Sequence, residues 1–219
     1  MRNNLDLTLY LVTDRLTANL TFEQLLEKVE QACKGGVGLV QLREKDVTFQ
    51  EYVEMAKRMM EVAHKYNVPF VVNDRIDVAL IAGTDGVHVG LDDMNVRDVR
   101  RILGRDKIVG ATAKSIERAQ QAEHEGADYL GTGAIFEPIY KVKTHRTSIE
   151  KLGEIAQSVN IPTVAISGIN RENLAELAES PIAGIAVEMD YILSANDGVL
   201  ETKLLRSDVV EKILNHSGK

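Results

Sequence analysis

A regular alternation of short apolar runs with longer amphipathic runs constrains the fold of this chain more than any other feature. Several apolar runs are continuous, as in strands of a parallel sheet that is covered on both faces. They predict strands at Thr8–Thr13, Gly38–Leu42, Phe70–Asn73, Gly86–Val89, Ile108–Ala111, Tyr129–Gly133, Thr163–Ile166 and Gly184–Val187. Apolar residues at helical spacing predict helices at Phe22–Lys34, Tyr52–His64, Val96–Leu103, Ile116–Glu125, Ile149–Val159 and Asn173–Glu179.

About eight strand–helix units in 219 residues favour a closed (β/α)8 TIM barrel, an α/β fold, over an open doubly wound sheet. No Pro/Gly-rich linker divides the chain, so residues 1–219 are expected to form one barrel domain. The least regular stretches, Glu137–Thr147 and Glu188–Thr202, both follow late strands. Loops at the carboxyl ends of barrel strands line the catalytic face, so these stretches are expected near the active site.

Composition and charge argue against several classes of function. The net charge of −7 and the absence of a basic patch argue against a nucleic-acid partner. No stretch approaches the ~20 apolar residues of a membrane span, and the first residues form no apolar signal core, so a cytoplasmic location is expected. With one cysteine, Cys33, the chain can form no internal disulfide and no Cys-based zinc site. An acidic protein that binds an anionic substrate needs local cations or a metal.

The second predicted strand continues into a charged run, Gln41 to Asp46. Alternate residues of a strand face the same side, so Gln41, Arg43 and Lys45 are expected to point together into the barrel mouth. An amide and two cations at that place suit a diphosphate. The alternative is a solvated charge run at a strand end.

Carboxylates follow the next two strands. Asn73 and Asp74 end the third strand, and Asp93 follows the fourth after Asp92. Carboxylates from neighbouring strand ends can hold Mg²⁺, which takes oxygen ligands and bridges to substrate phosphates. Asp74 and Asp93 could each instead cap the helix that follows.

The later strands end in glycine and hydroxyl residues. The fifth leads to Thr112 and the sixth to Gly131–Gly133, where glycine allows a substrate to approach the backbone. Lys141 and Lys143 in the next loop could reach a phosphate or lie in solvent. His145 is more typical of a surface histidine than of a catalytic one.

The ends of the last two strands give opposite indications. Gly168, after the seventh strand, suits a phosphate site made from backbone N–H groups, which many barrels have at this place. The eighth strand runs into Glu188, Met189 and Asp190. Carboxylates beside a phosphate repel it, so this end of the predicted site is unusual.

Along nearly its whole length the chain resembles the thiamine phosphate synthase family. No single motif is specific, but their order and spacing together are. The matching segments are Leu9–Asp14, Gln41–Asp46, Val72–Arg75, Gly86–Gly90 with Asp93, Gly126–Tyr129 and Gly133–Phe136. This family joins hydroxymethylpyrimidine diphosphate to thiazole phosphate and releases diphosphate, with Mg²⁺.

The resemblance implies roles on the diphosphate side of the site. Arg43, Lys45 and Lys141 would stabilise the departing diphosphate. Gln41 and Asn73 would contact the same substrate. The metal ligands would be Asp74 and Asp93, and Thr112 stands where the family has a serine near the pyrimidine.

The departures from the family pattern lie on the thiazole side. Pro138 and Tyr140 replace two threonines that contact the thiazole phosphate, and Glu188 with Met189 replaces an apolar residue and a serine. Ser167 replaces the first glycine of a pair that ends with Gly168. The second substrate could therefore be an unphosphorylated thiazole alcohol that donates a hydrogen bond to Glu188, or another nucleophile. Alternatively, Glu188 turns away to pair with a lysine or arginine, and thiazole phosphate still binds through backbone groups.

Three other functions fit parts of the same sequence pattern. A thiazole tautomerase resembles the same barrel but uses a histidine where this chain has Ala134, and it lacks the full carboxylate pair. A ligand-binding or regulatory relative would keep the diphosphate site without turnover. A sugar-phosphate isomerase would keep a clean glycine-rich phosphate loop, against which Glu188 argues. All of these bind small molecules, and the sequence leaves monomer and homodimer both open.

Overall fold

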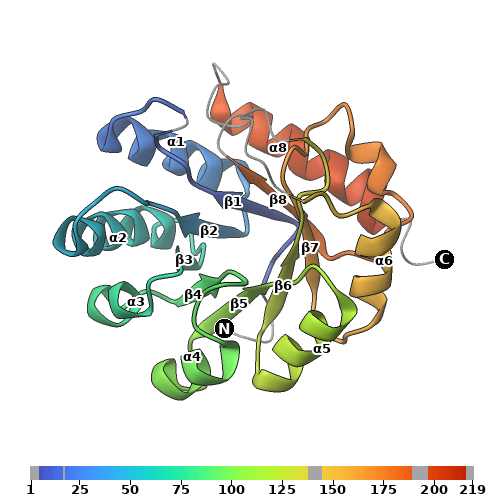
Figure 1. Cartoon of the computed structure of the whole chain (residues 1–219). Coiled ribbons are helices and arrows are strands. Elements are labelled where there is room, and N and C mark those ends of the chain that lie inside the picture. The colour runs from blue at the N-terminus through green and yellow to red at the C-terminus, as the bar shows by residue number, and fades with distance from the viewer. Residues whose placement is uncertain (1–4, 17, 138–144, 189–196, 216–219) are drawn as a thin grey trace.

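Eight parallel strands form a closed barrel in a computed structural model that describes residues 5–16, 18–137, 145–188 and 197–215. The strands pair in chain order, and β1 pairs with β8 to close the barrel (Figure 1). Their bounds are β1 (Leu9–Val12), β2 (Leu39–Leu42), β3 (Phe70–Asn73), β4 (Gly86–Val89), β5 (Ile108–Thr112), β6 (Tyr129–Thr132), β7 (Thr163–Ile166) and β8 (Gly184–Glu188). The predicted (β/α)8 barrel is confirmed, with strand ends that differ from prediction by one residue at most.

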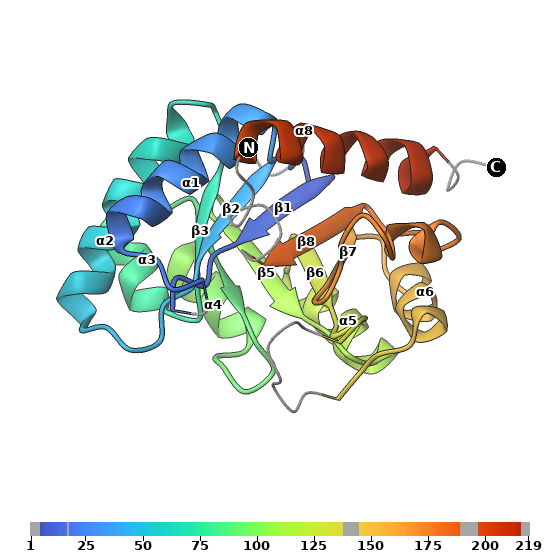
Figure 2. The same ribbon diagram turned by 90° about the horizontal axis from the view of Figure 1, so that it is seen from above.

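Helices surround the barrel, and Figure 2 shows α1, α2 and α3 on one side of the strands, with α5 and α6 on the other. The helices are α1 (Phe22–Gly35), α2 (Phe49–His64), α3 (Ile76–Ala82), α4 (Val96–Leu103), α5 (Ile116–Glu125), α6 (Ile149–Gln157), η2 (Leu174–Leu177), α8 (Gly198–Val209) and η3 (Val210–Leu214). No helix of the described residues is long and apolar enough to span a membrane. The ends of the chain lie outside the described residues, so the single domain over 1–219 stays a prediction.

Two of the predicted elements were wrong. The predicted helix Asn173–Glu179 is only a short 3-10 helix, Leu174–Leu177, that buries Leu174 and Leu177. The irregular stretch predicted over Glu188–Thr202 includes the last residue of β8 and the start of α8. Helix α8 carries apolar residues around most of its surface, with Leu200 exposed and Leu205 buried, so the sequence shows no clear apolar stripe there.

Side chains at the helix starts fix where most helices begin. Thr48 forms a capping box with Glu51, which places the start of α2 at Phe49, three residues before the predicted one. The same arrangement of Thr21 with Gln24 begins α1. Four further helices have side-chain caps, from Asn95, Ser115, Ser148 and Asp197. Each cap satisfies backbone N–H groups that the helix itself leaves without an acceptor.

The core has two layers. Apolar side chains of the helices pack on the outer surface of the strands, and a second cluster fills the barrel interior around Tyr10, Leu39, Val71, Ile108 and Tyr129. Closed packing of this kind leaves the carboxyl rim as the place where polar side chains gather.

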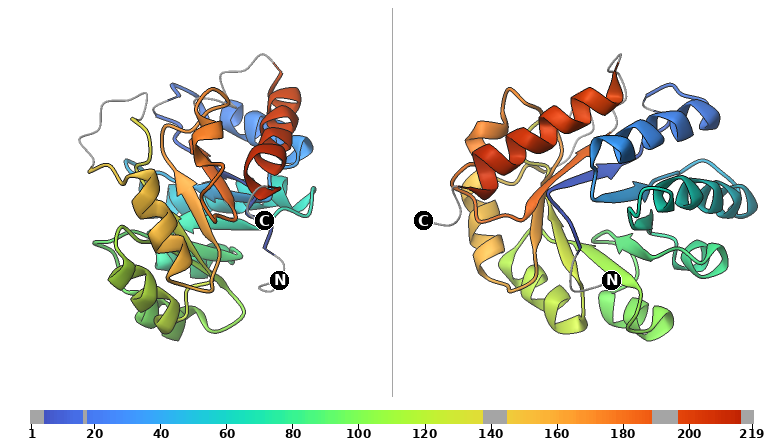
Figure 3. Two further views of the ribbon diagram at one scale, coloured as in Figure 1. Left: turned by 90° about the vertical axis from the view of Figure 1, so that its right-hand side faces the viewer. Right: turned by 180° about the vertical axis from the view of Figure 1, so that it is seen from behind.

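Helix α8 packs against α1, so the last helix closes the ring of helices beside the first (Figure 3). Gly35 makes the close approach feasible, because a Cβ there would lie 2.9 Å from the Val199 carbonyl oxygen. The contact supports the β1–β8 closure from outside.

A mostly buried arginine joins α4 to the amino-terminal ends of β5 and β6. Arg100 donates to the carbonyl oxygens of Gly126 and Lys107 and to the Asp128 carboxylate at 2.7 Å, and its side chain is 13% exposed. The same Asp128 oxygen accepts the N–H of Val109 at 2.8 Å. One charged pair therefore satisfies backbone groups of two loops at the end of the barrel opposite the carboxyl rim.

We expect Arg100→Met to lower the free energy of unfolding by about 3 kcal/mol, because it leaves a buried carboxylate without its cation. Urea unfolding followed by circular dichroism measures the change. Arg101→Met is the matched control, since that side chain is 79% exposed and pairs with Asp98 on its own helix. Equal losses in the two variants would contradict the structural role of Arg100.

Candidate active site

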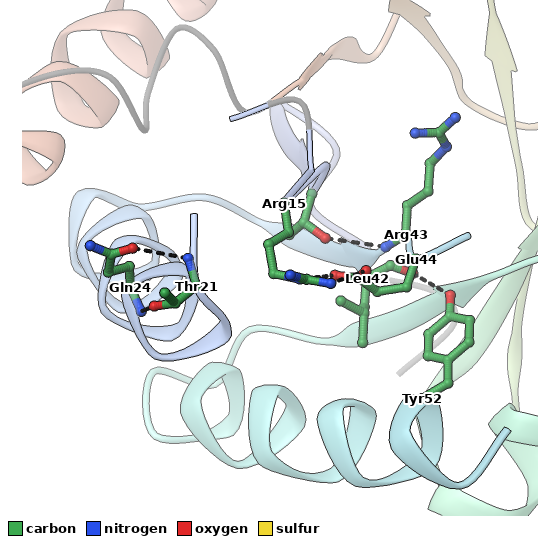
Figure 4. Close-up of polar contacts among 8 residues, drawn as sticks. Arg15, Thr21, Gln24, Leu42, Arg43, Glu44 and Tyr52 are labelled. Carbon is green, nitrogen blue, oxygen red and sulfur yellow. Dashed lines mark hydrogen bonds and ion pairs between the residues drawn. The ribbon is translucent and has the colours of Figure 1, made fainter. Parts of the chain in front are cut away.

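Two residues of the charged run after β2 form ion pairs with residues that follow β1. Arg43 pairs with Asp14, at 2.7 Å between Nη1 and Oδ2, and its backbone N–H donates to Thr13 Oγ1. The next residue, Glu44, binds Arg15 through both carboxylate oxygens, at 3.0 and 3.2 Å. Figure 4 shows the Arg43 side chain extending away from Glu44 and from α2. Successive side chains therefore point in different directions: Arg43 points to the site, and Glu44 links the ends of β1 and β2 through its ion pair with Arg15.

Tyr52 of α2 is hydrogen-bonded to the backbone at the ends of two strands. Its hydroxyl donates to the carbonyl oxygens of Leu42 at 2.9 Å and Asn73 at 3.3 Å (Figure 4 shows the first of these). These are the last residues of β2 and β3. One buried hydroxyl thus holds the backbone from which Arg43 and Asp74 project.

Asp74 lies directly after β3 in a left-handed conformation, with φ 62°. Its N–H donates to the His88 carbonyl oxygen of β4 at 2.8 Å. Helix α3 begins only at Ile76, after Arg75, and α4 is capped by Asn95. The alternative in which Asp74 and Asp93 are helix caps is therefore wrong.

The carboxyl groups of Asp74 and Asp93 lie side by side on the rim. Burial and the neighbouring Asp93 raise the pKa of Asp74 to about 7, whereas the charges of Arg43 and Lys45 oppose the increase. Asp93 is exposed and accepts the N–H of Gly90 at 2.7 Å. Four predicted site residues, from the ends of β2, β3 and β4, therefore act on one another electrostatically.

This pair fits Mg²⁺ by its chemistry. Mg²⁺ is commonly held by one or two carboxylates together with substrate phosphates, and two carboxylates that repel each other gain from a shared cation. The described residues include no cluster of three or more His, Cys, Asp or Glu side chains suited to a metal. Any ion at Asp74 and Asp93 would thus take further ligands from substrate or water.

The floor of the site is a connected row of buried polar side chains. Gln41 Nε2 donates to the Tyr10 hydroxyl, which lies 2.8 Å from the Tyr129 hydroxyl. That oxygen is 3.1 Å from His88 Nδ1, and His88 Nε2 is 3.0 Å from Thr112 Oγ1. Burial lowers the pKa of His88 to about 4 and raises those of both tyrosines, so the row is uncharged at neutral pH. The predicted residues Gln41 and Thr112 are its two ends.

The opposite half of the rim carries fewer described side chains. Ser167 and Gly168 follow β7 with φ of 82° and 67°, and the Gly168 carbonyl oxygen accepts from Asn173. Glu188 ends β8, where its backbone pairs with Val12 of β1. The predicted contacts of Lys141 and Met189 lie outside the described residues, as do the replacements Pro138 and Tyr140.

A cavity of about 500 Å³ lies at the other end of the barrel, lined by Leu5, Pro69, Ile108 and the His64–Asp85 pair. Asp85 there accepts the backbone N–H of Phe70. Because catalytic groups of such barrels gather at the carboxyl ends of the strands, we place the active site at the rim rather than in this cavity.

Comparison with known proteins identifies the family of the chain. The family profile described as thiamine monophosphate synthase matches residues 9–190. A relative from Clostridium tetani named thiamine-phosphate synthase is 50% identical over 194 residues, which are 89% of this chain and 91% of the relative. This chain belongs to the thiamine monophosphate synthase family. A second relative with the same name, from Ruminiclostridium cellulolyticum, is 47% identical over 90% of this chain and 92% of its own.

A solved structure has the same fold. Thiamine phosphate pyrophosphorylase from Pyrococcus furiosus is 36% identical, with a TM-score of 0.83 over 94% of this chain and 97% of the other. The similarity covers nearly the whole chain, so the barrel fold that places the site residues is shared with this solved structure.

Sequence reasoning missed four side chains of this synthase-family site. Asp14 pairs with Arg43, and Tyr10, His88 and Tyr129 form the middle of the buried row. All four lie inside matching motifs, so the motifs located them without indicating a contact. Strand alternation gave a usable signal, because polar residues on inward positions of β1, β4 and β6 must meet inside the barrel.

Asp74→Asn is expected to stabilise the metal-free protein more at pH 8 than at pH 5. Asp74 binds its proton more strongly in the folded than in the unfolded state, so folded stability falls as pH rises from the ordinary 3.8 towards 7. Asparagine removes that loss, and we expect Tm to rise by about 2–4 °C at pH 8. Calorimetry with the control Asp92→Asn measures this, and equal gains at both pH values would contradict it. Mg²⁺ should raise the Tm of the wild type more than that of Asp74→Asn.

Proposed function

We propose that this chain is a transferase that joins hydroxymethylpyrimidine diphosphate to thiazole phosphate and releases diphosphate. Family membership and the names of its relatives support this activity. The observation that carries the assignment of residues is the meeting of Asp74 and Asp93 with the charges of Arg43 and Lys45 at one part of the rim. Paired carboxylates beside two cations suit a diphosphate bound with a divalent cation.

Arg43 and Lys45 would bind the diphosphate oxygens. The guanidinium is already oriented by Asp14, which contacts Nη1 and leaves the other N–H groups of the planar fork for phosphate oxygens. Lys45 is exposed and can follow the substrate as a mobile point charge. As the bond to diphosphate breaks, negative charge grows on the leaving oxygens and these cations stabilise it.

Asp74 and Asp93 would hold Mg²⁺, which when bound supplies positive charge to the leaving diphosphate. Gln41 and Thr112 would hold the pyrimidine ring, so that its methylene carbon faces the second substrate. The electrons of the broken bond leave with diphosphate, and the thiazole nitrogen supplies the pair that forms the new C–N bond. The protein contributes position and electrostatic stabilisation, and no protein group needs to act as a nucleophile.

Ser167 and Gly168 support binding of a phosphate on the second substrate. Their successive left-handed backbone conformations form a tight turn at the end of β7, where barrels commonly bind phosphate. Lys141 belongs to this proposal through the family resemblance alone. Glu188 and Met189 belong to it only because they stand where the family has residues that contact the thiazole phosphate.

Lys45→Met is expected to lower kcat/KM for product formation by about 100-fold, since it removes a cation from the leaving group. Steady-state assay of the condensation measures this. Lys57→Met on α2 is the matched control, because this exposed lysine lies on the helix and not on the rim. A loss of the same size in the control would contradict the assignment.

The wild-type protein is expected to use thiazole phosphate at least about tenfold more efficiently than the thiazole alcohol, because a phosphate gains charge-assisted hydrogen bonds that an alcohol lacks. Parallel assays with both acceptors decide this. Preference for the alcohol, lost in Glu188→Ser, would favour the alternative in which the carboxylate accepts from its hydroxyl.

The competing functions have distinct outcomes in the same assays. A binding protein without turnover would bind pyrimidine diphosphate with Mg²⁺ and form no product from either acceptor. A tautomerase would need a base at position 134, where the structure has a buried alanine. The cytoplasmic location and the choice between monomer and homodimer stay predictions.

A further inference from the structure

Three side chains link Gln41 to Thr112 in the row of buried hydrogen bonds, and none of them has a role in the chemistry proposed above. Tyr10, Tyr129 and His88 come from three different strands, and both tyrosines are at most 1% exposed. Buried polar groups cost free energy unless they are hydrogen-bonded, and apolar residues of the same size would fill the barrel more simply. The row therefore calls for a function in addition to packing.

The backbone around the row makes room for it. A Cβ on Gly110 would overlap the Tyr129 ring, and one on Gly131 would lie 3.2 Å from His88 Cε1. The Tyr10 and Tyr129 rings meet edge to face at 5.7 Å between centroids, with their hydroxyls together. Two glycines on β5 and β6 thus accommodate two large polar side chains in fixed positions.

The orientation of the Gln41 amide, with its NH₂ group toward Tyr10, gives the row a single direction. The Tyr10 hydroxyl accepts from Gln41, so its one proton points to Tyr129. The Tyr129 proton then points to His88 Nδ1, and the ring N–H must lie on Nε2, where it donates to Thr112. If Tyr129 instead donated to Tyr10, the Tyr10 proton would lack an acceptor among these contacts, at the cost of a buried unmade hydrogen bond.

The direction of these hydrogen bonds determines which group, donor or acceptor, remains for a ligand on Gln41 and on Thr112. Gln41 uses its NH₂ group inward, which leaves the amide oxygen as an acceptor. Thr112 accepts from His88, which leaves its hydroxyl proton as a donor. Gln41 is the next-to-last residue of β2 and Thr112 the last of β5, so both lie at the end of the barrel that carries the site.

We propose that Tyr10, Tyr129 and His88 are positioning residues that hold Gln41 as an acceptor and Thr112 as a donor for the heterocyclic ring of the first substrate. This inference rests on the proposed function, since it assumes that those two residues contact the pyrimidine. The pattern selects a ring that carries an amino donor and a ring-nitrogen acceptor. A ring with the two reversed could bind only if all four hydrogen bonds of the row reversed together.

Tyr129→Phe tests the proposal, because it removes one hydroxyl and keeps the ring. Calorimetry compares the binding of pyrimidine diphosphate with that of inorganic diphosphate, both with Mg²⁺. We expect pyrimidine diphosphate to bind about 10-fold more weakly, the equivalent of one hydrogen bond, and inorganic diphosphate to bind as in the wild type. Tyr66→Phe is the matched control, since its hydroxyl contacts Glu30 away from the rim. Tyr10→Phe should repeat the pattern if Tyr129→Phe folds poorly.

Thr112→Val separates positioning from packing. If Tyr129 acts through Thr112, the 10-fold effect of Tyr129→Phe should fall to about 2-fold in the Thr112→Val background, as expected for residues of one network. Thr112→Ser keeps the hydroxyl and should preserve the full effect. Nitrogen-15 NMR of the His88 ring gives an independent measure, with the proton on Nε2 in the wild type and a mixture of tautomers in Tyr129→Phe.

The outcomes distinguish the two levels of the proposal. Equal weakening of both ligands in Tyr129→Phe, or additive effects with Thr112→Val, would mean that the row is structural only. A wild type that binds pyrimidine diphosphate no better than inorganic diphosphate would overturn the ring contacts of the proposed function itself, and the inference with them.

Discussion

The pairing of β1 with β8 is the constraint on which the other positions of the site depend. It closes the sheet, so that all eight strands end on one rim and Val12 lies next to Glu188. With the sheet closed, residues separated by dozens of positions in sequence come within hydrogen-bond distance. Tyr10 and Tyr129, 119 residues apart, share such a contact in the middle of the barrel.

The site divides by depth into a charged rim and an uncharged floor. At the rim, Asp74 and Asp93 repel each other while Arg43 and Lys45 counter the repulsion, which suits a highly charged substrate group bound with a cation. At the floor, hydroxyl, amide and imidazole groups satisfy one another without any net charge. This division matches a substrate with a diphosphate at one end and a polar ring at the other.

Strand alternation explains why much of the fold and the grouping of charged side chains at one part of the rim could be predicted from the sequence. Continuous apolar runs located every strand, and the residue after each run located Arg43, Asp74 and Thr112 on the rim. Contacts across the barrel could not be predicted, because the sequence gives no register between β1 and β6 and so no indication that Tyr10 meets Tyr129. The start of α8 was missed for a local reason, since Leu200 is exposed while Leu205 is buried.

The helix caps affect how freely the lengths of the rim loops can vary. Thr21, Thr48, Asn95, Ser115 and Ser148 each begin a helix by binding backbone N–H groups one turn ahead, without help from the preceding loop. A rim loop can therefore be lengthened, shortened or exchanged while the helix after it keeps its start. The strands and the row of buried polar side chains inside the barrel therefore do not depend on the lengths of the rim loops above them.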